Sequence, residues 1–511
     1  MAVIGTILKE VVKIKKNSVE KKELNFLLQE KTLRKLLEKA RITSFGKHFG
    51  FERMLSCNNL VKEFQSAIPV HDYERLFDEW WYRLLKGETN VTWPGKVRFF
   101  GLTSGTSNDS TKRVPLTKDM IRAMRKTGIR QLLALSEFDL PPDFYEKSIL
   151  MLGGSTELVK IEDYFEGDLS GILAGTLPFW FNRFHKPGKI SKERDWTTKL
   201  DKIVREAKKW DIAGIAGVPA WVQILIEKII HHYEVENIHD IWPNFKVYAH
   251  GGVHFTPYKN SFRKLLGKPV HFLETYLASE GFLAYQKKEN HNMQLVIDNG
   301  IFFEFIPFDS RNFSRDGELV KNPRALLLNE VEEYKEYAVL ISTVAGAWRY
   351  LIGDTIRFTS VKDYEIIITG RTKHFLSLCG EHLSVDNMTM AINEISEELN
   401  INIKEFTVAG IPYRGLFAHR WYIGTTAVEI DPKLVRKKLD MALKRLNDDY
   451  AVERRAALKE VLVEIIPEKV FYDWLRSKGR EGGQHKFPRV IGGMYNEWKD
   501  FVKKYNKDQL N

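Results

Sequence analysis

Apolar residues recur at helical spacing near the start of the chain. Across residues 3–12 they form one stripe, with Lys9 and Lys13 off it, which is the pattern of an amphipathic helix. We expect this stripe to dock on a core, although the lysines nearby leave open an anchor lying on an acidic membrane surface. A second helix is predicted over residues 23–40.

Short apolar runs alternate with helical stretches between residues 100 and 370. We predict strands at 148–152, 245–249, 301–306 and 338–341. Such alternation of strands and helices is typical of an α/β fold.

The pattern changes from about Gly370 onward. The elements predicted there are strands at 405–408, 420–423 and 461–466 and a charged helix over 432–455. We therefore predict an α/β protein with two domains. A large N-terminal domain over 1–370 has β-sheets flanked by helices, and a smaller, mobile α+β domain over 371–511 follows a compact hinge at Gly370 and Arg371.

The composition is that of a globular protein with a sizeable core. Of the 511 residues, 43% are hydrophobic and 28% are charged, which excludes disordered and fibrous classes. The net charge of +11 is concentrated in residues 1–50 and 371–511. No zinc-finger, RNP-type or basic-zipper pattern accompanies it, so nucleic acid is not an expected partner.

The number of cysteines and the lengths of the apolar runs indicate in which cellular compartment the protein is expected. Cys57 and Cys379 are too few for a disulfide framework or a zinc site, which suits a reducing compartment. The longest uncharged stretches, 169–182 and 212–226, fall short of the roughly 18 apolar residues that span a bilayer. The first apolar run breaks at Lys9, too early for a signal peptide. We expect a cytoplasmic monomer without an integral membrane segment.

The first segment with candidate chemistry is a hydroxyl-rich loop that ends in Lys112 and Arg113. Hydroxyls and backbone amides of such a loop can cradle phosphate oxygens while the cations neutralise their charge. No Walker sequence is present, and a polar surface turn is the alternative interpretation. The candidate phosphate-binding residues are Thr103, Ser104, Gly105, Thr106, Ser107 and Lys112.

Two further segments end in a carboxylate. Glu280 closes residues 275–280, which follow an apolar, strand-like run at 269–273. Mg²⁺ is typically held by one or two carboxylates plus substrate phosphates, so Glu280 is a candidate metal ligand. Asp354 follows Gly353 in a predicted tight turn. An acid after a strand can accept hydrogen bonds from ribose hydroxyls, although a Gly-Asp pair is also a common turn.

The fourth segment is a glycine-hinged loop, in which Gly482 and Gly483 precede Lys486. Mobile glycines beside a lysine suit a gated site, because the cation must enter for chemistry and leave for release. The alternative is an exposed loop lysine.

In this order and spacing, the four segments together resemble the Gretchen Hagen family of acyl acid amido synthetases, which are relatives of acyl-CoA synthetases. Residues 103–115 are similar to the family's phosphate loop, and residues 276–280 to its Tyr-Ala-Ser-Ser-Glu motif. Residues 350–354 resemble Tyr-Arg-Val-Gly-Asp, and residues 484–489 resemble the stretch that bears the adenylation lysine. With a further similarity at 29–51, the resemblance spans nearly the whole chain.

The resemblance implies that a carboxylic acid is adenylated with ATP and Mg²⁺ and that its acyl group then passes to an amino acid or other amine. Lys486 and Glu280 are the implied catalytic residues, with Glu280 also as the metal ligand. The implied nucleotide-binding residues are Thr103, Ser104, Gly105, Thr106, Ser107, Lys112, Gly251, Gly252, Tyr276, Ala278, Ser279, Asp354 and Arg371.

Some positions depart from the family pattern. Leu351 stands where the family has Arg in the third motif, with Arg349 and Arg357 close by. Lys373 occupies a hinge position where adenylating relatives usually have Asp, and residues 108–109 introduce an acid into the phosphate loop.

His250 and His254 are four residues apart, but a zinc site is not predicted there. The intervening glycines disfavour a helix, and the Glu of a metalloprotease motif is missing. We interpret Gly251 and Gly252 as a backbone wall near the adenine, because paired glycines let the chain approach a flat ring closely. The aromatic residues that fit either the core or an acid pocket include Trp180, Phe181 and Trp221.

Two alternatives to an amide-forming ligase stay open. One is an acid-thiol ligase that forms a coenzyme A ester on the same adenylate. The other is a non-catalytic nucleotide-binding protein, against which the intact Glu280, Asp354 and Lys486 argue.

Overall fold

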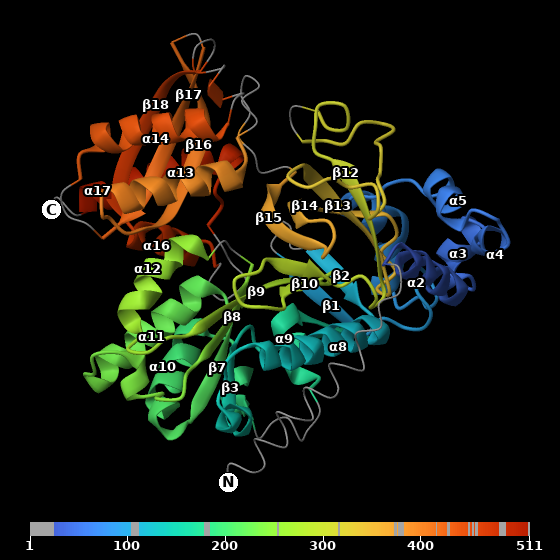
Figure 1. Ribbon diagram of the computed structural model, residues 1–511, viewed down its shortest axis with the longest axis horizontal. Helices are drawn as coiled ribbons and strands as arrows, with labels where there is room; N and C mark the ends of the chain where they lie inside the picture. Colours follow the sequence, from blue (N-terminus) through green and yellow to red (C-terminus); the bar gives the residue numbers. More distant parts are fainter. Residues whose placement is uncertain are drawn as a thin grey trace.

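The computed structural model consists of a cluster of N-terminal helices, a large mixed sheet with its helices, and a C-terminal unit (Figure 1). The residues that it describes are 25–103, 112–177, 184–252, 255–314, 317–372, 376, 383–414, 416–426, 430–447, 450–451, 454, 458–479 and 487–508. The helix predicted over residues 3–12 lies outside them.

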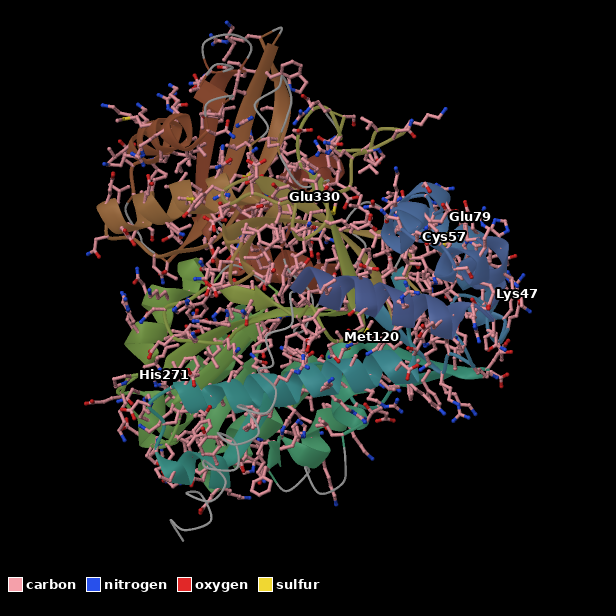
Figure 2. The ribbon with its side chains drawn as sticks, turned by 45° about the vertical axis from the view of Figure 1, so that its right-hand side comes forward. Lys47, Cys57, Glu79, Met120, His271 and Glu330 are labelled. Atoms are coloured by element: carbon pink, nitrogen blue, oxygen red, sulfur yellow. The ribbon has the colours of Figure 1, made fainter. Side chains whose placement is uncertain are left out.

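The N-terminal helices pack on the edge of the large sheet. They are α2 (Asn25–Ala40), α3 (Ser44–His48), α4 (Phe51–Leu55), α5 (Leu60–Ala67), α6 (Tyr73–Leu76), the π-helix η1 (Phe77–Trp81) and α7 (Tyr82–Leu85). Helix α2 confirms the helix predicted over 23–40. The buried amide of Gln29 fixes α2 to the sheet, because it donates to the carbonyls of Ile297 and Ile301 and accepts from the Phe303 backbone nitrogen. Figure 2 shows Lys47, Cys57 and Glu79 in this cluster, on the side of the molecule opposite His271.

The large sheet has eleven strands in the order β12-β13-β14-β15-β11-β10-β9-β8-β7-β3-β6. Strands β6, β3, β7, β8 and β9 are parallel, and the others join through antiparallel pairs. The bounds are β3 Ser148–Leu152, β6 His185–Lys186, β7 Ile212–Gly217, β8 Val247–Gly251, β9 His271–Ala278, β10 Gly281–Gln286, β11 Met293–Leu295, β12 Ile301–Pro307, β13 Glu336–Thr343, β14 Tyr350–Ser360 and β15 Glu365–Arg371. The strands predicted at 148–152, 301–306 and 338–341 are confirmed, and the one predicted at 245–249 is β8, which begins at Val247.

Helices cover both faces of the parallel strands, and a small sheet lies beside them. Figure 1 shows α10, α11 and α12 on one side of these strands and α8 and α9 on the other. The helix bounds are α8 Lys118–Ala134, α9 Leu169–Gly175, α10 Trp196–Glu206, α11 Pro219–Tyr233 and α12 Thr256–Leu265. The four strands of the small sheet, in the order β2-β1-β5-β4, are β2 Lys112–Leu116, β1 Phe99–Thr103, β5 Tyr164–Asp168 and β4 Val159–Ile161.

The C-terminal unit is a three-stranded sheet with helices. Its elements are α13 (Val385–Glu398), β16 (Ile403–Tyr413), β17 (Leu416–Thr425), α14 (Pro432–Leu446), β18 (Leu458–Pro467), α16 (Lys469–Ser477) and α17 (Tyr495–Asp508). The helix predicted over 432–455 is therefore interrupted. Asn447 adopts an extended backbone that ends α14, and its side-chain oxygen accepts from the Tyr450 backbone nitrogen at the start of the next helical turn.

The C-terminal unit contacts the large unit through α12, which lies beside it in Figure 1, and through the packing of α13 on β15. The Tyr258 hydroxyl donates a 2.9 Å hydrogen bond to Glu405, and the Asn402 amide donates to the Ser261 hydroxyl at 2.8 Å. Both contacts are hydrogen bonds between polar side chains. Every helix in the described part of the chain is too short or too polar to cross a membrane.

Candidate active site

One cavity of about 1220 Å³ lies at the carboxyl ends of the parallel strands, between the sheet, α8 and the C-terminal unit. In open α/β sheets, ligands bind at this edge. The cavity brings together residues that are far apart in the sequence. The sequence-predicted site residues that line it are Lys112, Gly251, Gly252, Tyr276, Ala278, Ser279, Glu280, Asp354 and Arg371.

Other predicted positions lie outside the described residues. Thr103 is the last residue of β1 and pairs with Lys112 of the antiparallel strand β2, so these two strands frame the hydroxyl-rich loop. The predicted positions outside the described residues are Ser104, Gly105, Thr106, Ser107, Trp180, Phe181, His254, Lys373 and Lys486.

Glu280 lies in the turn between β9 and β10. The strand predicted to end at residue 273 continues to Ala278, so Tyr276 is a strand residue. The Glu280 side chain is buried, and Oε1 accepts a 3.1 Å hydrogen bond from the Tyr350 hydroxyl. Burial raises the pKa of Glu280 above its ordinary value, and the nearby charge of Asp354 acts in the same direction. The turn therefore presents a poorly compensated carboxylate to the cavity.

Asp354 lies in a β-bulge rather than in the tight turn that the sequence predicts. Ala338 pairs with Thr355 and Leu340 pairs with Leu351, so three residues of β14 stand opposite one residue of β13. Gly353 has φ of +86° within this bulge, a conformation that glycine adopts without strain. The bulge explains why a Gly-Asp pair occurs in the middle of a long strand.

Asp354 is held by two partners from neighbouring strands. The Tyr276 hydroxyl donates to Oδ2 at 2.6 Å, and Nε of Arg371 lies 3.0 Å from Oδ1. Arg371 also donates to the Ile352 carbonyl at 3.2 Å. The charge of Asp354 raises the pKa of Arg371, and burial raises the pKa of Tyr276. Asp354 is therefore fixed in place, and the phenol that binds it stays protonated.

The charges at this end of the cavity fit a divalent cation bound together with phosphates. Two carboxylates, Glu280 and Asp354, are compensated here by one guanidinium, that of Arg371. Among the described residues, no group of three or more His, Cys, Asp or Glu side chains could hold a metal by itself. This donor set matches Mg²⁺, which takes one or two carboxylates and completes its shell with phosphate oxygens and water.

Lys112 and Arg113 differ in their placement. Lys112 lines the cavity, with Nζ 3.4 Å from Glu74 and 4.8 Å from the centre of the Tyr73 ring. Arg113, which the sequence groups with it as a phosphate ligand, instead donates to Glu166 at 2.8 Å and is absent from the cavity lining. Alternating side chains of β2 point to opposite faces, so only one of the two cations reaches the cavity.

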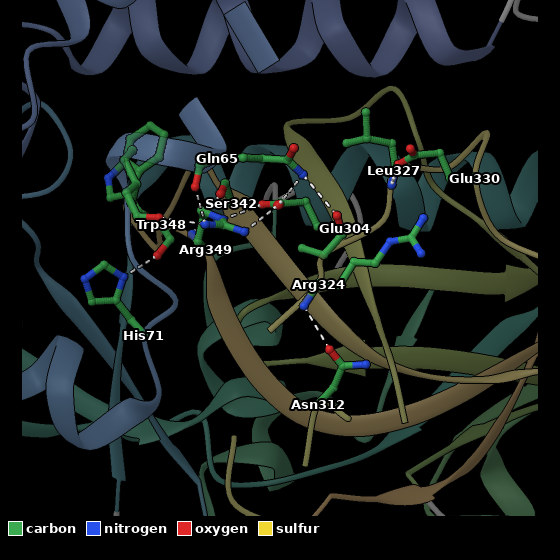
Figure 3. Close-up of polar contacts among 12 residues, drawn as sticks. Gln65, His71, Glu304, Asn312, Arg324, Leu327, Glu330, Ser342, Trp348 and Arg349 are labelled. Atoms are coloured by element: carbon green, nitrogen blue, oxygen red, sulfur yellow. Dashed lines mark hydrogen bonds and ion pairs between the residues drawn. The ribbon is translucent and has the colours of Figure 1, made fainter. Parts of the chain in front are cut away.

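Arg349 does not take the place of the family's arginine, at whose position this chain has Leu351. Its guanidinium donates to both oxygens of Glu304 at 3.0 and 3.1 Å and to the carbonyls of Gln65 and Ile68 (Figure 3). Arg357 pairs with Glu336 at 2.8 Å. Neither arginine lines the cavity.

Gly251 and Gly252, at the end of β8, border the cavity. A side chain at Gly251 would lie 2.5 Å from the Thr275 carbonyl oxygen, so a larger residue has no room there. Gly252 has φ of +83°. Next to them, the buried ring of His250 stacks on Phe255 with the ring centres 4.3 Å apart.

An apolar part of the cavity lies between α8 and one face of the parallel strands. Gly214 and Ala216 of β7 and Ala249 of β8 face it, and these small residues leave the space unfilled. In a strand over 212–217, Gly214 and Ala216 fall on the same face, and two small residues on one face are the sequence signal that could have found this wall. Trp221 lines the cavity as well. The apolar residues that complete the lining include Met124, Ile129, Leu132, Phe144, Met151 and Leu173.

Sequence reasoning missed the polar cluster by which the C-terminal unit closes the cavity. Arg489 Nη1 donates to Glu405 at 2.6 Å, and the Tyr258 hydroxyl donates to the other oxygen of that carboxylate. Arg489 follows the predicted adenylation lysine by three positions, which was its only signal. Glu405 lies in a buried strand and gave none.

Three models of one family match the chain: the GH3 family N-terminal domain at residues 25–160, the central domain at 294–371 and the C-terminal domain at 386–493. Together they cover more than half of the chain.

Two curated plant proteins are similar to parts of the chain. A probable indole-3-acetic acid-amido synthetase of Oryza sativa is 25% identical over 222 residues, or 38% of this chain and 36% of that protein. An indole-3-acetic acid-amido synthetase of Arabidopsis thaliana is 25% identical over 334 residues, or 59% of this chain and 54% of that protein. The matches thus span from about a third to about half the length of these relatives.

Solved structures share the fold over nearly the whole chain. GH3.15 acyl acid amido synthetase superposes with a TM-score of 0.76 at 15% identity, covering 94% of this chain and 93% of that one. A 2-hydroxyisobutyryl-CoA ligase in its postadenylation state gives 0.60 at 13% identity, covering 95% and 92%. The adenylate-forming fold predicted from the sequence is confirmed. From the three family models and this shared fold, the chain belongs to the GH3 family.

Proposed function

We propose that this protein is an ATP-dependent acyl acid amido synthetase, which adenylates a carboxylic acid and transfers the acyl group to an amino acid or other amine. The observation that carries the proposal is the convergence of Glu280, Asp354 and Arg371 at one end of a cavity whose other part is apolar. A charged end suits a nucleotide and its metal, and an apolar part suits the body of an acid. The names of the relatives, which are amido synthetases, support the same activity.

In this proposal the nucleotide lies along the carboxyl edge of the sheet. Asp354, held by Tyr276 and Arg371, accepts hydrogen bonds from the ribose hydroxyls. Gly251 and Gly252 face the adenine ring, with Ala278 and Ser279 beside it. Residues 103–107 and Lys112 bind the β and γ phosphates, where hydroxyls, backbone amides and one cation compensate their charge.

Glu280 is the proposed ligand of Mg²⁺, which would neutralise the charge of the triphosphate when bound. The Tyr350 hydroxyl orients the Glu280 carboxylate. The raised pKa of Glu280 supports this role, because a buried carboxylate with too few positive partners gains most from a divalent cation.

The proposed reaction has two steps, adenylation of the acid and transfer of its acyl group to the amine. A carboxylate oxygen of the acid attacks the α-phosphorus of ATP, and the bond to pyrophosphate breaks, which leaves an acyl adenylate. The amine nitrogen then attacks the acyl carbon, the bond to the adenylate oxygen breaks, and AMP leaves. Lys486 is proposed to bridge the acid and the α-phosphate, where a preorganised cation stabilises the charge that develops.

We propose further that the chain consists of a large unit over 1–370 and a mobile unit over 371–511. The polar contacts at the boundary, Tyr258 with Glu405 and Asn402 with Ser261, support this division. Rotation of the small unit would exchange the residues that face the adenylate between the two steps.

The test is an incubation of the purified protein with ATP, Mg²⁺ and a pool of carboxylic acids, with either an amino-acid pool or coenzyme A added. AMP together with a new amide is the expected result. AMP with a thioester would favour the thiol ligase instead. ATP binding without AMP under every combination would favour the non-catalytic alternative.

We infer that the protein acts in the cytoplasm as a monomer. The two cysteines support a reducing compartment.

A further inference from the structure

Lys199 of α10 contributes a buried ammonium group to the cavity, away from the proposed nucleotide end. The residue is only 2% exposed and lines the cavity, and Nζ donates a 3.2 Å hydrogen bond to the carbonyl of Gly153, just past the end of β3. Nζ also lies 5.3 Å from the centre of the Trp196 ring. A lysine is almost never fully buried without a partner, so this one calls for an explanation.

The described residues give Lys199 no ion pair. Asp168 and Glu193 act on its charge from a distance, and Glu193 is itself bound to Lys202 at 2.5 Å. One backbone carbonyl and one aromatic ring therefore offset the loss of water around the ammonium. Burial lowers the pKa of Lys199 to about 8, which leaves the group largely protonated at neutral pH. A buried, undercompensated cation that lines a cavity is a candidate for binding an anion.

The position of Lys199 separates it from the reacting end. In the sheet, β9, β8, β7 and β3 lie side by side in this order, as Figure 1 shows. Glu280 follows β9 and Gly153 follows β3, so three strand spacings, or roughly 14 Å, separate the two ends. The amine that attacks an acyl adenylate must lie within contact of the acyl carbon. A group at Lys199 is therefore too distant to be the α-carboxylate of a small amino acid.

We propose that Lys199 binds a second anionic group at the far end of the acid, so that the substrate class is acids with an apolar body and a distal carboxylate. The inference rests on the proposed function, because it names the acid that this site adenylates. The acid must be shorter than this roughly 14 Å, because its reacting carboxylate contacts the α-phosphate rather than Glu280 itself. A dicarboxylate of about six to eight carbons, such as octanedioate, fits within this span, and the apolar wall at Gly214 and Ala216 faces its methylene groups.

The test compares octanedioate with nonanoate, a monocarboxylate of similar size, by isothermal titration calorimetry without ATP. Lys199→Met keeps most of the side-chain volume and removes the charge. We expect this variant to bind octanedioate at least tenfold more weakly than the wild type, as for loss of a charged hydrogen bond. Its affinity for nonanoate should change less than twofold, which also shows that the variant is folded. Lys199→Arg should keep most of the preference for octanedioate.

Lys209 is an exposed lysine just beyond α10 that pairs with Glu206. The substitution Lys209→Met is the matched control and should change neither the affinity for octanedioate nor that for nonanoate. Equal losses for both acids in Lys199→Met, or no binding of octanedioate to the wild type at millimolar concentration, would overturn the inference. AMP formation with Mg-ATP is measured in parallel. Absence of AMP despite the expected binding pattern would count against the proposed ligase alone.

Discussion

The hydroxyl of Tyr276 donates a 2.6 Å hydrogen bond to Asp354, a residue 78 positions later in the chain. The bond joins β9 to the bulge of β14 and orients the carboxylate that is proposed to bind the ribose. Burial holds the pKa of Tyr276 well above its ordinary value, so the phenol donates this bond at every physiological pH.

Tyr276→Phe removes that bond and leaves the ring in place. Because hydrogen bonds to charged groups contribute about 1.5–3 kcal/mol, we expect KM for ATP in pyrophosphate exchange to rise about tenfold or more with a smaller change in kcat. Tyr233→Phe is the control, since the Tyr233 hydroxyl donates to the carbonyls of Val204 and Arg205 away from the cavity. An unchanged KM for ATP in Tyr276→Phe would show that Asp354 does not bind the ribose.

Glu280→Gln should separate stability from activity. Because burial raises the pKa of Glu280, the folded protein binds this proton more tightly than the unfolded chain does. The stability it contributes is present below the unfolded pKa and is lost as pH rises through the folded pKa. Glutamine never ionises, so without Mg²⁺ and ATP the variant should melt at a higher temperature than the wild type. That difference should widen from pH 5 to pH 8.

The same variant should lose roughly 10²-fold in Mg²⁺-dependent pyrophosphate exchange. Thermal melting and exchange assays measure the two effects separately. Glu332→Gln, an exposed carboxylate paired with Lys335, is the control for both. A melting difference that is the same at every pH would contradict the buried, raised-pKa state of Glu280.

Arg349→Met should destabilise the large unit by about 3–5 kcal/mol, because it leaves the Glu304 carboxylate buried without its partner. Both side chains are almost fully buried, at 8% and 1% exposure. Denaturant unfolding followed by tryptophan fluorescence measures the loss. Arg311→Met removes a cation that is 83% exposed and paired with Asp309, and it should cost less than about 1 kcal/mol. Equal losses of unfolding free energy in the two variants would show that the buried Arg349–Glu304 pair contributes no more to stability than the exposed pair.

Cross-linking the two units tests whether the small unit moves. The Asn402 amide lies 2.8 Å from the Ser261 hydroxyl across the boundary, so a Ser261→Cys/Asn402→Cys variant should form a disulfide under oxidation. We expect oxidation to reduce amide formation at least tenfold and reduction to restore it, whereas each single-cysteine variant stays active. If the oxidised, cross-linked enzyme carries out both half-reactions at the wild-type rate, the proposal that the C-terminal unit moves between them is wrong.

Lys486→Ala should slow adenylation by roughly 10²-fold or more, as for loss of a preorganised charge in the transition state. Pyrophosphate exchange measures this step without the amine. Lys478→Ala, which removes a lysine paired with Glu497, is the control. Exchange at the wild-type rate in Lys486→Ala would show that another group supplies the charge.

The local elements could be predicted from the sequence where apolar runs were uninterrupted. The run at 148–152 is β3, and α2 lies within the helix predicted over 23–40. The prediction failed where tertiary contacts decide the backbone. Gly353 and Asp354 suggest a turn by their local preference, but pairing of β14 with β13 on one side and β15 on the other makes them a bulge.

The candidate site was predicted residue by residue but not as an arrangement. Periodicity does not reveal that β15 would lie beside β14 and place Arg371 next to Asp354. It also does not reveal that a positive φ at Arg349 accompanies a side chain bound to Glu304, away from the cavity. Lys199 went unnoticed because, in the sequence, it is an ordinary lysine on an amphipathic helix.

The most direct test of the proposed function follows oxygen from the acid to AMP. A pool of carboxylic acids labelled with ¹⁸O in the carboxylate, including octanedioate, is incubated with the protein, ATP, Mg²⁺ and an amino-acid pool, and the nucleotides are analysed by mass spectrometry. If an acyl adenylate forms and the amine attacks its acyl carbon, AMP gains one ¹⁸O atom and an amide appears. Amide formation with ADP and phosphate, or with unlabelled AMP, would contradict the mechanism.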